Sequence, residues 1–287
     1  MDQILRDQIQ AFIKQGLQED VRDGDHTSLA CIPAKNKDKV KLLVKEDCVL
    51  AGVELAKHVL KFVDPEVKIE LLKKDGDEVV YGDIAFYATS YSQALLKAER
   101  LLLNAMQRMS GVATMSRQFQ KAIEGLPVTI LDTRKTTPLI RFLEKWAVRI
   151  GGCTNYRDGL YDWIMIKDNH VDANGSITSA VKKVEEYFAE KNMKLGVTVE
   201  VRNFEEMRET MSVGKNIVTR IMLDNFEIPK MAEAVKIING AYEVEASGGI
   251  TLKTVRDIAE TGVDYISSGA LTHSPTSKDL SLKIVKD

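Results

Sequence analysis

The second half of the chain alternates short apolar runs with amphipathic segments, and this alternation constrains the fold most strongly. Each run ends in polar residues; the runs are VTILDTRK (128–135), WIMIKDN (163–169), GVTVEV (196–201), RIMLDN (220–225), YEVEASGG (242–249) and DYISSGAL (264–271). The amphipathic segments predict helices over 176–190, 203–213, 228–239 and 251–261. Strands alternating with helices predict βαβ units and a parallel sheet. So many units favour closure into an α/β barrel, where the carboxyl ends of the strands carry the chemistry.

The first part of the chain predicts a smaller α+β unit. Helical spacing covers residues 2–19 and 52–63, strand-like patterns fall within 39–50 and 68–90, and a long helix is expected over 92–109. Gly111 is expected to break that helix, which then resumes over 113–124. The predicted domains are 1–112 and 113–274, with the C-terminal tail 275–287 packing on the first.

Charge and composition exclude several classes of protein. Lys and Arg number 40 against 42 Asp and Glu, so a general nucleic-acid binder, which needs a basic excess, is not expected. No apolar stretch approaches the roughly 20 residues that span a bilayer, and the N-terminus lacks the pattern of a secretory signal. The three cysteines and four histidines are scattered, which argues against a disulfide framework or a zinc site. We therefore expect a cytoplasmic protein that binds no membrane.

Cations concentrate where the predicted strands end. Arg134, Lys135 and Lys167 follow strands, and Arg157 lies in a glycine-rich loop. Gathering cations in a barrel mouth costs self-repulsion, so the pattern indicates a polyanionic ligand, with Arg suited to carboxylate or phosphate. By contrast, three further cations recur every four residues on the helix that follows the first strand and are expected to form its solvated face: Arg141, Lys145 and Arg149.

Two carboxylates, Glu200 and Asp224, end consecutive strands. Among cations they could bind Mg²⁺, hold sugar hydroxyls, or stabilise a carbocationic sugar carbon. A structural salt bridge with the same cations is the alternative, and the residues alone leave it open.

Two late turns combine serine with glycine. The first holds Ser247, Gly248 and Gly249 before the helix predicted over 251–261, and the second holds Ser268 and Gly269. Glycine lets backbone N–H groups approach an anion, and a helix N-terminus adds a favourable dipole, so we interpret both turns as phosphate-binding loops. The alternative for Gly248 and Gly249 is a tight turn without a ligand.

These segments together resemble one protein family, the quinolinate phosphoribosyltransferases, which are carboxylating nicotinate-nucleotide pyrophosphorylases of NAD biosynthesis. The resemblance extends in order from about residue 19 to 275 and rests on EDVRDGDHTS (19–28), ERLLLNAMQRMSGVAT (99–114), DTRKTTPLIRFLEKWAVRIGG (132–152), NYRDGLYD (155–162), IKDNH (166–170), VEV (199–201), MLDN (222–225), EASGGI (245–250) and GVDYISSGALTHS (262–274).

The resemblance implies a fold, a reaction and an assembly. The fold is an N-terminal α/β sandwich domain with an open seven-stranded α/β barrel. The reaction joins quinolinate to phosphoribosyl pyrophosphate with Mg²⁺, releases pyrophosphate and CO2, and yields nicotinate mononucleotide. The assembly is a homodimer, or a larger oligomer, in which Arg100 reaches the neighbouring active site.

The resemblance also implies roles for individual residues. The cations that bind the substrate carboxylates are Arg134, Lys135, Arg157 and Lys167. Glu200 and Asp224 serve the ribose and the metal, and together with Lys135 they are the implied catalytic residues. The phosphate-loop positions are Ser247, Gly248, Gly249, Ser268 and Gly269.

One position departs from the family pattern. The family reads Asn-His-Arg where this chain has Asn155, Tyr156 and Arg157, and the histidine is counted among the residues of the substrate pocket. Tyrosine keeps an aromatic plane and a hydroxyl but carries no positive charge near neutral pH, because its usual pKa is about 10. Either Tyr156 suffices in the pocket, or the acceptor has changed.

Three other functions compete with this one. A paralogue of the same fold linked to molybdenum transport would keep the phosphoribosyl site and change the acceptor. A Schiff-base aldolase would use Lys167 as its nucleophile. A binding protein that has lost activity is the third, against which stands the full set of pocket cations and carboxylates.

Overall fold

The computed structural model describes residues 3–285, which form two compact units. Unit 1 contains the residues up to Arg117, the segment Thr136–Gly152 and the residues from Thr272 onward. Unit 2 contains Gln118–Lys135 and Cys153–Leu271. Neither unit is one continuous stretch of sequence. The domains 1–112 and 113–274, with the tail 275–287 packing on the first, stay a prediction.

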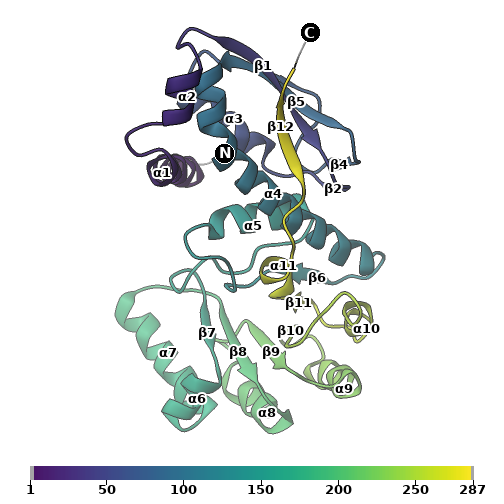
Figure 1. Cartoon of the computed structure of the whole chain (residues 1–287). Helices are drawn as coiled ribbons and strands as arrows, with labels where there is room; N and C mark the ends of the chain where they lie inside the picture. Colours follow the sequence, from purple (N-terminus) through teal and green to yellow (C-terminus); the bar gives the residue numbers. More distant parts are fainter. Residues whose placement is uncertain (1–2, 286–287) are drawn as a thin grey trace. The chain divides into compact units, whose positions relative to one another are not determined.

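A four-stranded antiparallel sheet in the order β12, β1, β5, β3 lies in unit 1 (Figure 1). Its strands are β1 (Lys37–Val44), β3 (Lys68–Leu71), β5 (Ile84–Tyr91) and β12 (Leu280–Ile284), and β2 (Cys48–Val49) pairs separately with β4 (Glu78–Val79). Val40, Leu42 and Val44 of β1 are buried at alternate positions, the pattern of a sheet with one covered face. Pairing of β12 with β1 brings the C-terminal segment into the N-terminal sheet.

Four helices lie in unit 1 in addition to most of α4 (Ser92–Ala122): α1 (Gln3–Asp20), α2 (His26–Cys31), α3 (Val53–Val63) and α5 (Arg141–Ile150). Ile9, Ile13 and Leu17 of α1 are buried at intervals of four residues, and α1 contacts α3. The helices expected over 2–19 and 52–63 are therefore confirmed, although residue 2 lies outside the described part of the chain.

The predicted break at Gly111 is wrong, because α4 runs without interruption over Ser92–Ala122. A glycine inside a helix costs only about 1 kcal/mol relative to alanine. Buried residues on both sides of Gly111, among them Met109 and Val112, anchor the helix in the core and offset that cost. Gly111 serves packing instead: a Cβ there would lie 2.2 Å from the backbone oxygen of Thr276, so only glycine admits this segment.

The expected solvated face of α5 is also only partly correct. Arg149 is exposed and Arg141 half-buried, but Lys145 is only 2% exposed and Glu144 is fully buried. Glu144 accepts hydrogen bonds from Arg108 and from the backbone and side chain of Thr137. Regular spacing of charges along a helix thus did not reveal which of them tertiary contacts bury.

Unit 2 is built on a six-stranded parallel sheet in the order β6, β11, β10, β9, β8, β7. Its strands are β6 (Thr129–Leu131), β7 (Ile164–Ile166), β8 (Val197–Val201), β9 (Arg220–Asp224), β10 (Glu243–Ser247) and β11 (Tyr265–Ser267). All of the apolar runs recognised in the sequence form strands, so the predicted α/β class is confirmed. Beyond β6, Thr154 makes an isolated parallel bridge with Leu131, which stands in place of a seventh full strand.

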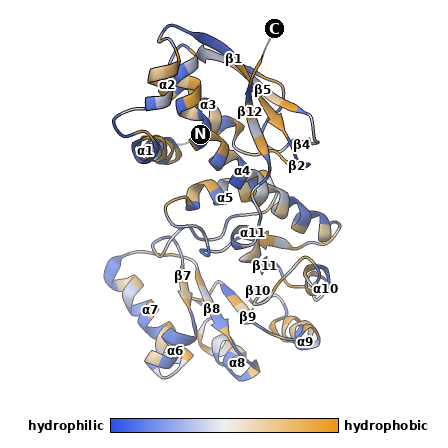
Figure 2. Ribbon diagram, in the orientation of Figure 1, coloured by the Kyte–Doolittle hydropathy of each residue, from blue (hydrophilic) through white to orange (hydrophobic). Residues whose placement is uncertain are grey.

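Helices separate these strands along the chain, as the alternation predicts. They are α6 (Asp168–Asn174), α7 (Ile177–Lys191), α8 (Phe204–Val213), α9 (Ile228–Ile238) and α10 (Val255–Ala259); the short α11 (Ala270–His273) follows β11. Figure 2 shows both hydrophilic and hydrophobic residues along α7, α8 and α9, as expected for helices with one buried face. Within residues 3–285, no helix is both long and apolar enough to cross a membrane.

Candidate active site

The carboxyl ends of the parallel strands bring several of the predicted residues onto one face of the sheet. Glu200 on β8 is level with Met222 on β9, and Asp224 on β9 is level with Ser247 on β10. Residues two apart in a strand point to the same face, so these four side chains project from the same side. Glu200, Asp224 and Ser247 therefore come together at one end of the unit 2 sheet.

Asp132, directly after β6, anchors the loop that carries Tyr156 and Arg157. Its buried carboxylate accepts hydrogen bonds from Nδ2 of Asn155 at 2.5 Å and from the backbone N–H of Tyr156 at 2.9 Å. A buried carboxylate is costly unless donors surround it, so these bonds fix the loop as well as the carboxylate. Arg157 is thereby held near the strand end that precedes Arg134.

Arg134 and Arg157 place two guanidinium groups close to one another. Burial, and next the positive charge of Arg134, lower the pKa of Arg157. Nη1 of Arg157 donates to the backbone oxygen of Trp163 at 3.2 Å, which orients its planar group. Lys135 is exposed beside Arg134, and its backbone N–H donates to Oγ1 of Thr133 at 3.1 Å. Cations held this near to one another favour an anion between them.

Lys167, directly after β7, and Glu200 on β8 form an ion pair. Nζ of Lys167 donates to Oε2 of Glu200, which is buried, whereas 41% of the Lys167 side chain is exposed. The salt bridge that the sequence left open for Glu200 is therefore present. Because its lysine faces solvent, this pair can also admit an anion on the lysine side and a hydroxyl on the carboxylate side.

Asp224 and the first glycine turn are linked through Asn225. Nδ2 of Asn225 donates to Oδ2 of Asp224 at 2.8 Å, and its backbone N–H donates to the Ser247 oxygen at 2.9 Å. Gly248 has a φ of +96°, and a Cβ there would lie 2.3 Å from Oδ1 of Asn225. Glycine is thus required at 248 both by the backbone conformation and by close packing.

The two glycine turns adjoin each other. Ser268 is buried, and its hydroxyl donates to the backbone oxygen of Ile250 at 3.1 Å, at the end of the first turn. Its backbone N–H donates to the oxygen of Leu131 on β6. Gly269 follows directly and precedes α11. In this arrangement the backbone of Gly248, Gly249 and Gly269, which carries no side chain, is suited to approach a phosphate.

The helix expected directly after the first turn begins later than predicted. α10 starts at Val255 and has five residues, so turns occupy most of the segment after Gly249. Thr251 and Thr254 bond to each other there and close the turn locally. The contribution of a helix dipole beside the first turn is therefore not supported, and the interpretation of this turn rests on its glycines.

Sequence reasoning missed a buried charged cluster on the same face of the sheet. Arg220 is level with Glu243, and Glu245 lies two residues further along β10; Arg220 and Glu245 are both buried. Burial raises the pKa of Glu245, and the nearby Arg220 charge works in the opposite direction. Burial, followed by the Glu245 charge, also raises the pKa of Tyr156. The available signals were the alternation of Glu243 and Glu245 with apolar residues in YEVEA, and the arginine that begins the apolar run RIMLD.

Arg100 lies in unit 1. It lies on α4 with 59% of its side chain exposed, and its guanidinium is 4.0 Å from the Glu99 carboxylate. Its predicted role at a neighbouring active site stays a prediction.

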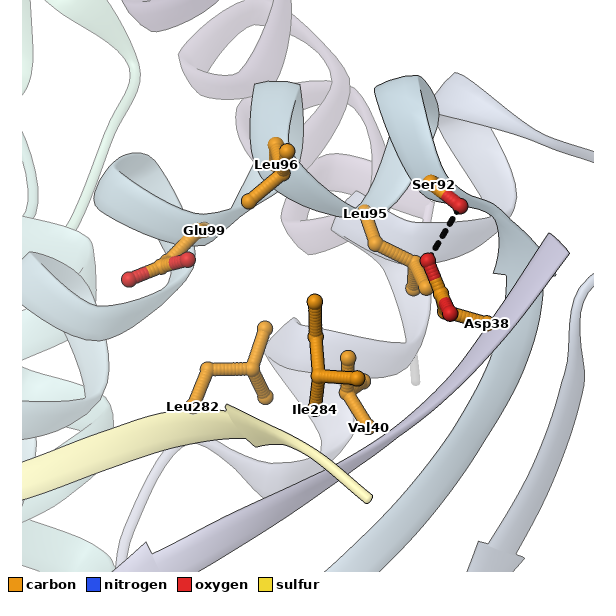
Figure 3. Close-up of a pocket in the computed structure, with 8 residues that line it drawn as sticks. All are labelled: Asp38, Val40, Ser92, Leu95, Leu96, Glu99, Leu282 and Ile284. Atoms are coloured by element: carbon orange, nitrogen blue, oxygen red, sulfur yellow. Dashed lines mark hydrogen bonds between the residues drawn. The ribbon is translucent and has the colours of Figure 1, made fainter. Parts of the chain in front are cut away.

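A small hollow in unit 1 is not suited to the anionic substrates (Figure 3). Apolar side chains from β1, β12 and α4 point into it, and Asp38 and Glu99 lie at its edges; its lining is Asp38, Val40, Ser92, Leu95, Leu96, Glu99, Leu282 and Ile284. Two carboxylates and no cation in the lining would repel a polyanion.

Comparison with known families assigns both parts of the chain to the same family. Residues 25–110 match the family described as quinolinate phosphoribosyl transferase, N-terminal domain. Residues 112–283 match the corresponding C-terminal domain.

Individual relatives match over nearly the whole chain. The chloroplastic nicotinate-nucleotide pyrophosphorylase (carboxylating) of Arabidopsis thaliana is 46% identical over 289 residues, covering 96% of this chain and 82% of the relative. A probable nicotinate-nucleotide pyrophosphorylase (carboxylating) of Synechocystis is 39% identical, with 97% and 93% covered. The crystal structure of NadC from Streptococcus pyogenes superimposes with a TM-score of 0.89 at 36% identity, covering 97% of this chain and 98% of that one.

Proposed function

The chain belongs to the quinolinate phosphoribosyltransferase family, and from this we propose how its site works. It is a phosphoribosyltransferase of NAD biosynthesis, which transfers the phosphoribosyl group of phosphoribosyl pyrophosphate to quinolinate. Nicotinate mononucleotide, pyrophosphate and CO2 are the products. The roles of individual residues, the metal, the assembly and the location given below are our proposals.

The acceptor pocket is formed by Arg134 and Arg157, with Lys135 and Lys167 beside them. Quinolinate carries two carboxylates, and planar guanidinium groups bind carboxylates through paired hydrogen bonds. The observation that carries this assignment is that Arg157, whose guanidinium donates to the backbone of Trp163, is half-buried where the positive charge of Arg134 acts on it. Without an anion the two groups repel each other, so a dicarboxylate between them relieves that repulsion.

The phosphoribosyl group lies along Glu200, Asp224 and the glycine turns. Carboxylates beside the ribose accept hydrogen bonds from its hydroxyls and stabilise positive charge that develops at the anomeric carbon. Backbone N–H groups at Gly248, Gly249 and Gly269 approach the 5′-phosphate.

Glu200 and Asp224 also fit a role near Mg²⁺. No group of three or more His, Cys, Asp or Glu side chains in residues 3–285 could hold a metal ion. Magnesium is commonly held by one or two carboxylates together with substrate phosphates, and Glu200 and Asp224 could supply these carboxylates. When bound, Mg²⁺ neutralises charge on the departing pyrophosphate.

The chemistry needs positioning and charge more than a protein nucleophile. The quinolinate ring nitrogen attacks the anomeric carbon, and the bond to pyrophosphate breaks with its electron pair leaving on oxygen. The ring is now a pyridinium, so the adjacent carboxylate leaves as CO2, its bonding electrons pass toward the ring nitrogen, and a proton takes its place. Held cations and carboxylates contribute by orientation and electrostatic stabilisation.

We propose a homodimer or a larger oligomer in which Arg100 completes the neighbouring site, and a cytoplasmic location. The exposed position of Arg100 supports the first. For the second, no disulfide joins Cys31, Cys48 and Cys153; Cys31 is exposed, and burial raises the pKa of Cys48 to about 11, which keeps that thiol protonated. The names of plant relatives include the words chloroplastic and mitochondrial, so localisation of the tagged protein in its own cells is the required test.

The experiment for the function is direct. Purified protein is incubated with quinolinate, phosphoribosyl pyrophosphate and Mg²⁺, and nicotinate mononucleotide is measured by mass spectrometry, with omission of each substrate as the control. Formation of the product with release of one CO2 per turnover supports the assignment. Absence of product, with the donor consumed only in the presence of another acceptor, would instead identify a paralogue with a changed acceptor.

A further inference from the structure

Arg220 is a buried arginine on the face of the unit 2 sheet that carries the site. It begins β9, its side chain is 6% exposed, and it is level with Thr198 on β8 and Glu243 on β10. Side chains inside α/β barrels are mostly branched and apolar, so a guanidinium here needs compensation by specific partners.

Two carboxylates provide part of that compensation. Nε of Arg220 donates to Oε2 of Glu243 at 2.9 Å, and Nη1 donates to Oε2 of Glu245 at 3.1 Å. Glu243 is partly exposed, whereas Glu245 is completely buried. Glu245 therefore depends on protein groups to offset its charge, and Arg220 bonds to it directly.

Three aromatic rings provide the remaining compensation for the buried charge of Arg220. The central carbon of the Arg220 guanidinium lies 3.7 Å from the ring centre of Tyr265, 5.1 Å from that of Tyr156 and 5.6 Å from that of Trp163. Tyr156 and Trp163 meet edge to face, with ring centres 6.0 Å apart. Their polar ends converge on Thr198, whose Oγ1 accepts from Nε1 of Trp163 at 2.9 Å and lies 2.6 Å from the Tyr156 hydroxyl.

This arrangement is continuous with the acceptor pocket. Tyr156 precedes Arg157, and Arg157 donates to the backbone of Trp163. The charge of Glu245 acts on Arg157 as well as on Arg220. Glu245 thus lies within the electrostatic reach of two cations, one beneath the pocket and one that belongs to it.

We propose that Arg220 is a positioning residue for acceptor binding, because it neutralises Glu245 and holds Tyr156 and Trp163 in place. Without Arg220, the buried Glu245 carboxylate would lose the cation that bonds to it, beside the loop that carries Arg157. The aromatic pair that supports the Arg157 loop would also lose the cation on which it stacks. The inference rests on the proposed function, since it concerns the affinity for the dicarboxylate acceptor and not for the phosphoribosyl donor.

The test compares charge-altering variants by calorimetry with quinolinate. Arg220→Met should lower the affinity for quinolinate at least tenfold and leave the KM for phosphoribosyl pyrophosphate within about threefold of wild type. The double variant Arg220→Met with Glu245→Gln should recover most of the affinity, because it removes both charges together. Arg220→Lys, which keeps a cation beside Glu245, should stay within about threefold.

Arg208→Met is the matched control. Arg208 also stacks on an aromatic ring, with its guanidinium carbon 5.7 Å from the ring centre of Phe204, but it lies exposed on α8. Its replacement should leave quinolinate affinity unchanged. Circular dichroism and the melting temperature are recorded for each variant, so that loss of folding is distinguished from loss of binding.

The outcomes are separable. A folded Arg220→Met variant with wild-type affinity, or a double variant as weak as the single one, overturns the inference. If Arg220→Met does not fold, Glu245→Gln alone decides: the inference requires affinity at least equal to wild type, and a tenfold loss overturns it. Failure of the wild-type protein to bind quinolinate and form nicotinate mononucleotide rejects the proposed function itself.

Discussion

Tyr156 stands where the family resemblance leads us to expect a histidine, and its hydroxyl contacts another side chain of the protein. The hydroxyl lies 2.6 Å from Oγ1 of Thr198, and burial raises its pKa, so the side chain stays neutral at physiological pH. A proton shuttle at this position is therefore excluded for a tyrosine so placed. The ring and the backbone, which Asp132 anchors, remain available to shape the pocket.

We predict that Tyr156→Phe loses stability more than activity. Removal of the hydroxyl deletes its contact with Thr198, which should lower the free energy of unfolding by about 1 kcal/mol. Quinolinate affinity should change by less than tenfold, because the ring still stacks on Arg220. Urea denaturation and calorimetry measure the two effects. A larger loss of affinity with unchanged stability would mean that the hydroxyl contacts the substrate.

For Asp224, we expect an effect on the donor and not on the acceptor. Asp224→Ala should lower turnover by about 10²–10³-fold, the usual consequence of removing one group that stabilises developing charge. Quinolinate affinity should stay within about threefold, because a carboxylate beside a dicarboxylate would only repel it. Glu200→Ala is the parallel variant and additionally releases Lys167. Collapse of quinolinate binding in both variants would contradict the assignment.

Two glycines, one in the first glycine turn and one in α4, show how a single residue type can be required at one position of an element. Gly248 has a positive φ and no room for a Cβ, whereas Gly111 has helical geometry and no room for one. Both positions therefore require glycine, but for different reasons: the first is conformational and steric, and the second is steric only.

Gly248→Ala should impair the donor site specifically. The added methyl would clash with Asn225, which also bonds to Asp224, so the KM for phosphoribosyl pyrophosphate should rise at least tenfold. Gly240→Ala is the control, because Gly240 has a φ of +72° but nothing within 4 Å of its Cβ position. If both variants raise this KM equally, steric contact with Asn225 is not the cause.

Gly111→Ala should destabilise the protein although alanine is the better helix former. Helix propensity alone would add about 1 kcal/mol of stability, but the methyl would meet the backbone oxygen of Thr276. Gly16→Ala in α1 is the matched control, because the methyl there meets the movable end of Leu101. Thermal unfolding should show a lower melting temperature for Gly111→Ala and little change for Gly16→Ala. A stabilised Gly111→Ala protein would show that the Thr276 segment moves aside without cost.

The proposed dimer has a testable consequence for the assembled enzyme. Arg100 belongs to unit 1, and the cations Arg134 and Arg157 belong to unit 2. If Arg100 serves the site of a neighbouring subunit, an inactive Arg100 subunit and an inactive pocket subunit can compensate for each other.

Mixing Arg100→Ala with Lys135→Ala is expected to restore activity that neither variant has alone. After subunit exchange, a hybrid dimer contains one site with both changes and one intact site, so up to about a quarter of wild-type activity should return. Exchange is followed independently with differently tagged subunits. No recovery despite confirmed exchange would show that Arg100 acts in its own subunit or not at all.

The sequence by itself determined the elements and the class of the site. Short apolar runs and periods of about 3.6 residues are local properties, so they located the strands of unit 2 and most helices, and the residues at the ends of those strands supplied the candidate pocket cations and carboxylates. Family motifs then supplied the reaction.

Only the tertiary structure decided which of these residues meet. Strand register is set between segments distant in the chain, so it alone revealed that Arg220 bonds to Glu243 and Glu245. The continuity of α4 through Gly111 and the burial of Lys145 are likewise outcomes of packing against distant segments. Local patterns report the preferences of neighbouring residues, whereas burial and pairing depend on the free energy of contacts that form only when the chain has folded.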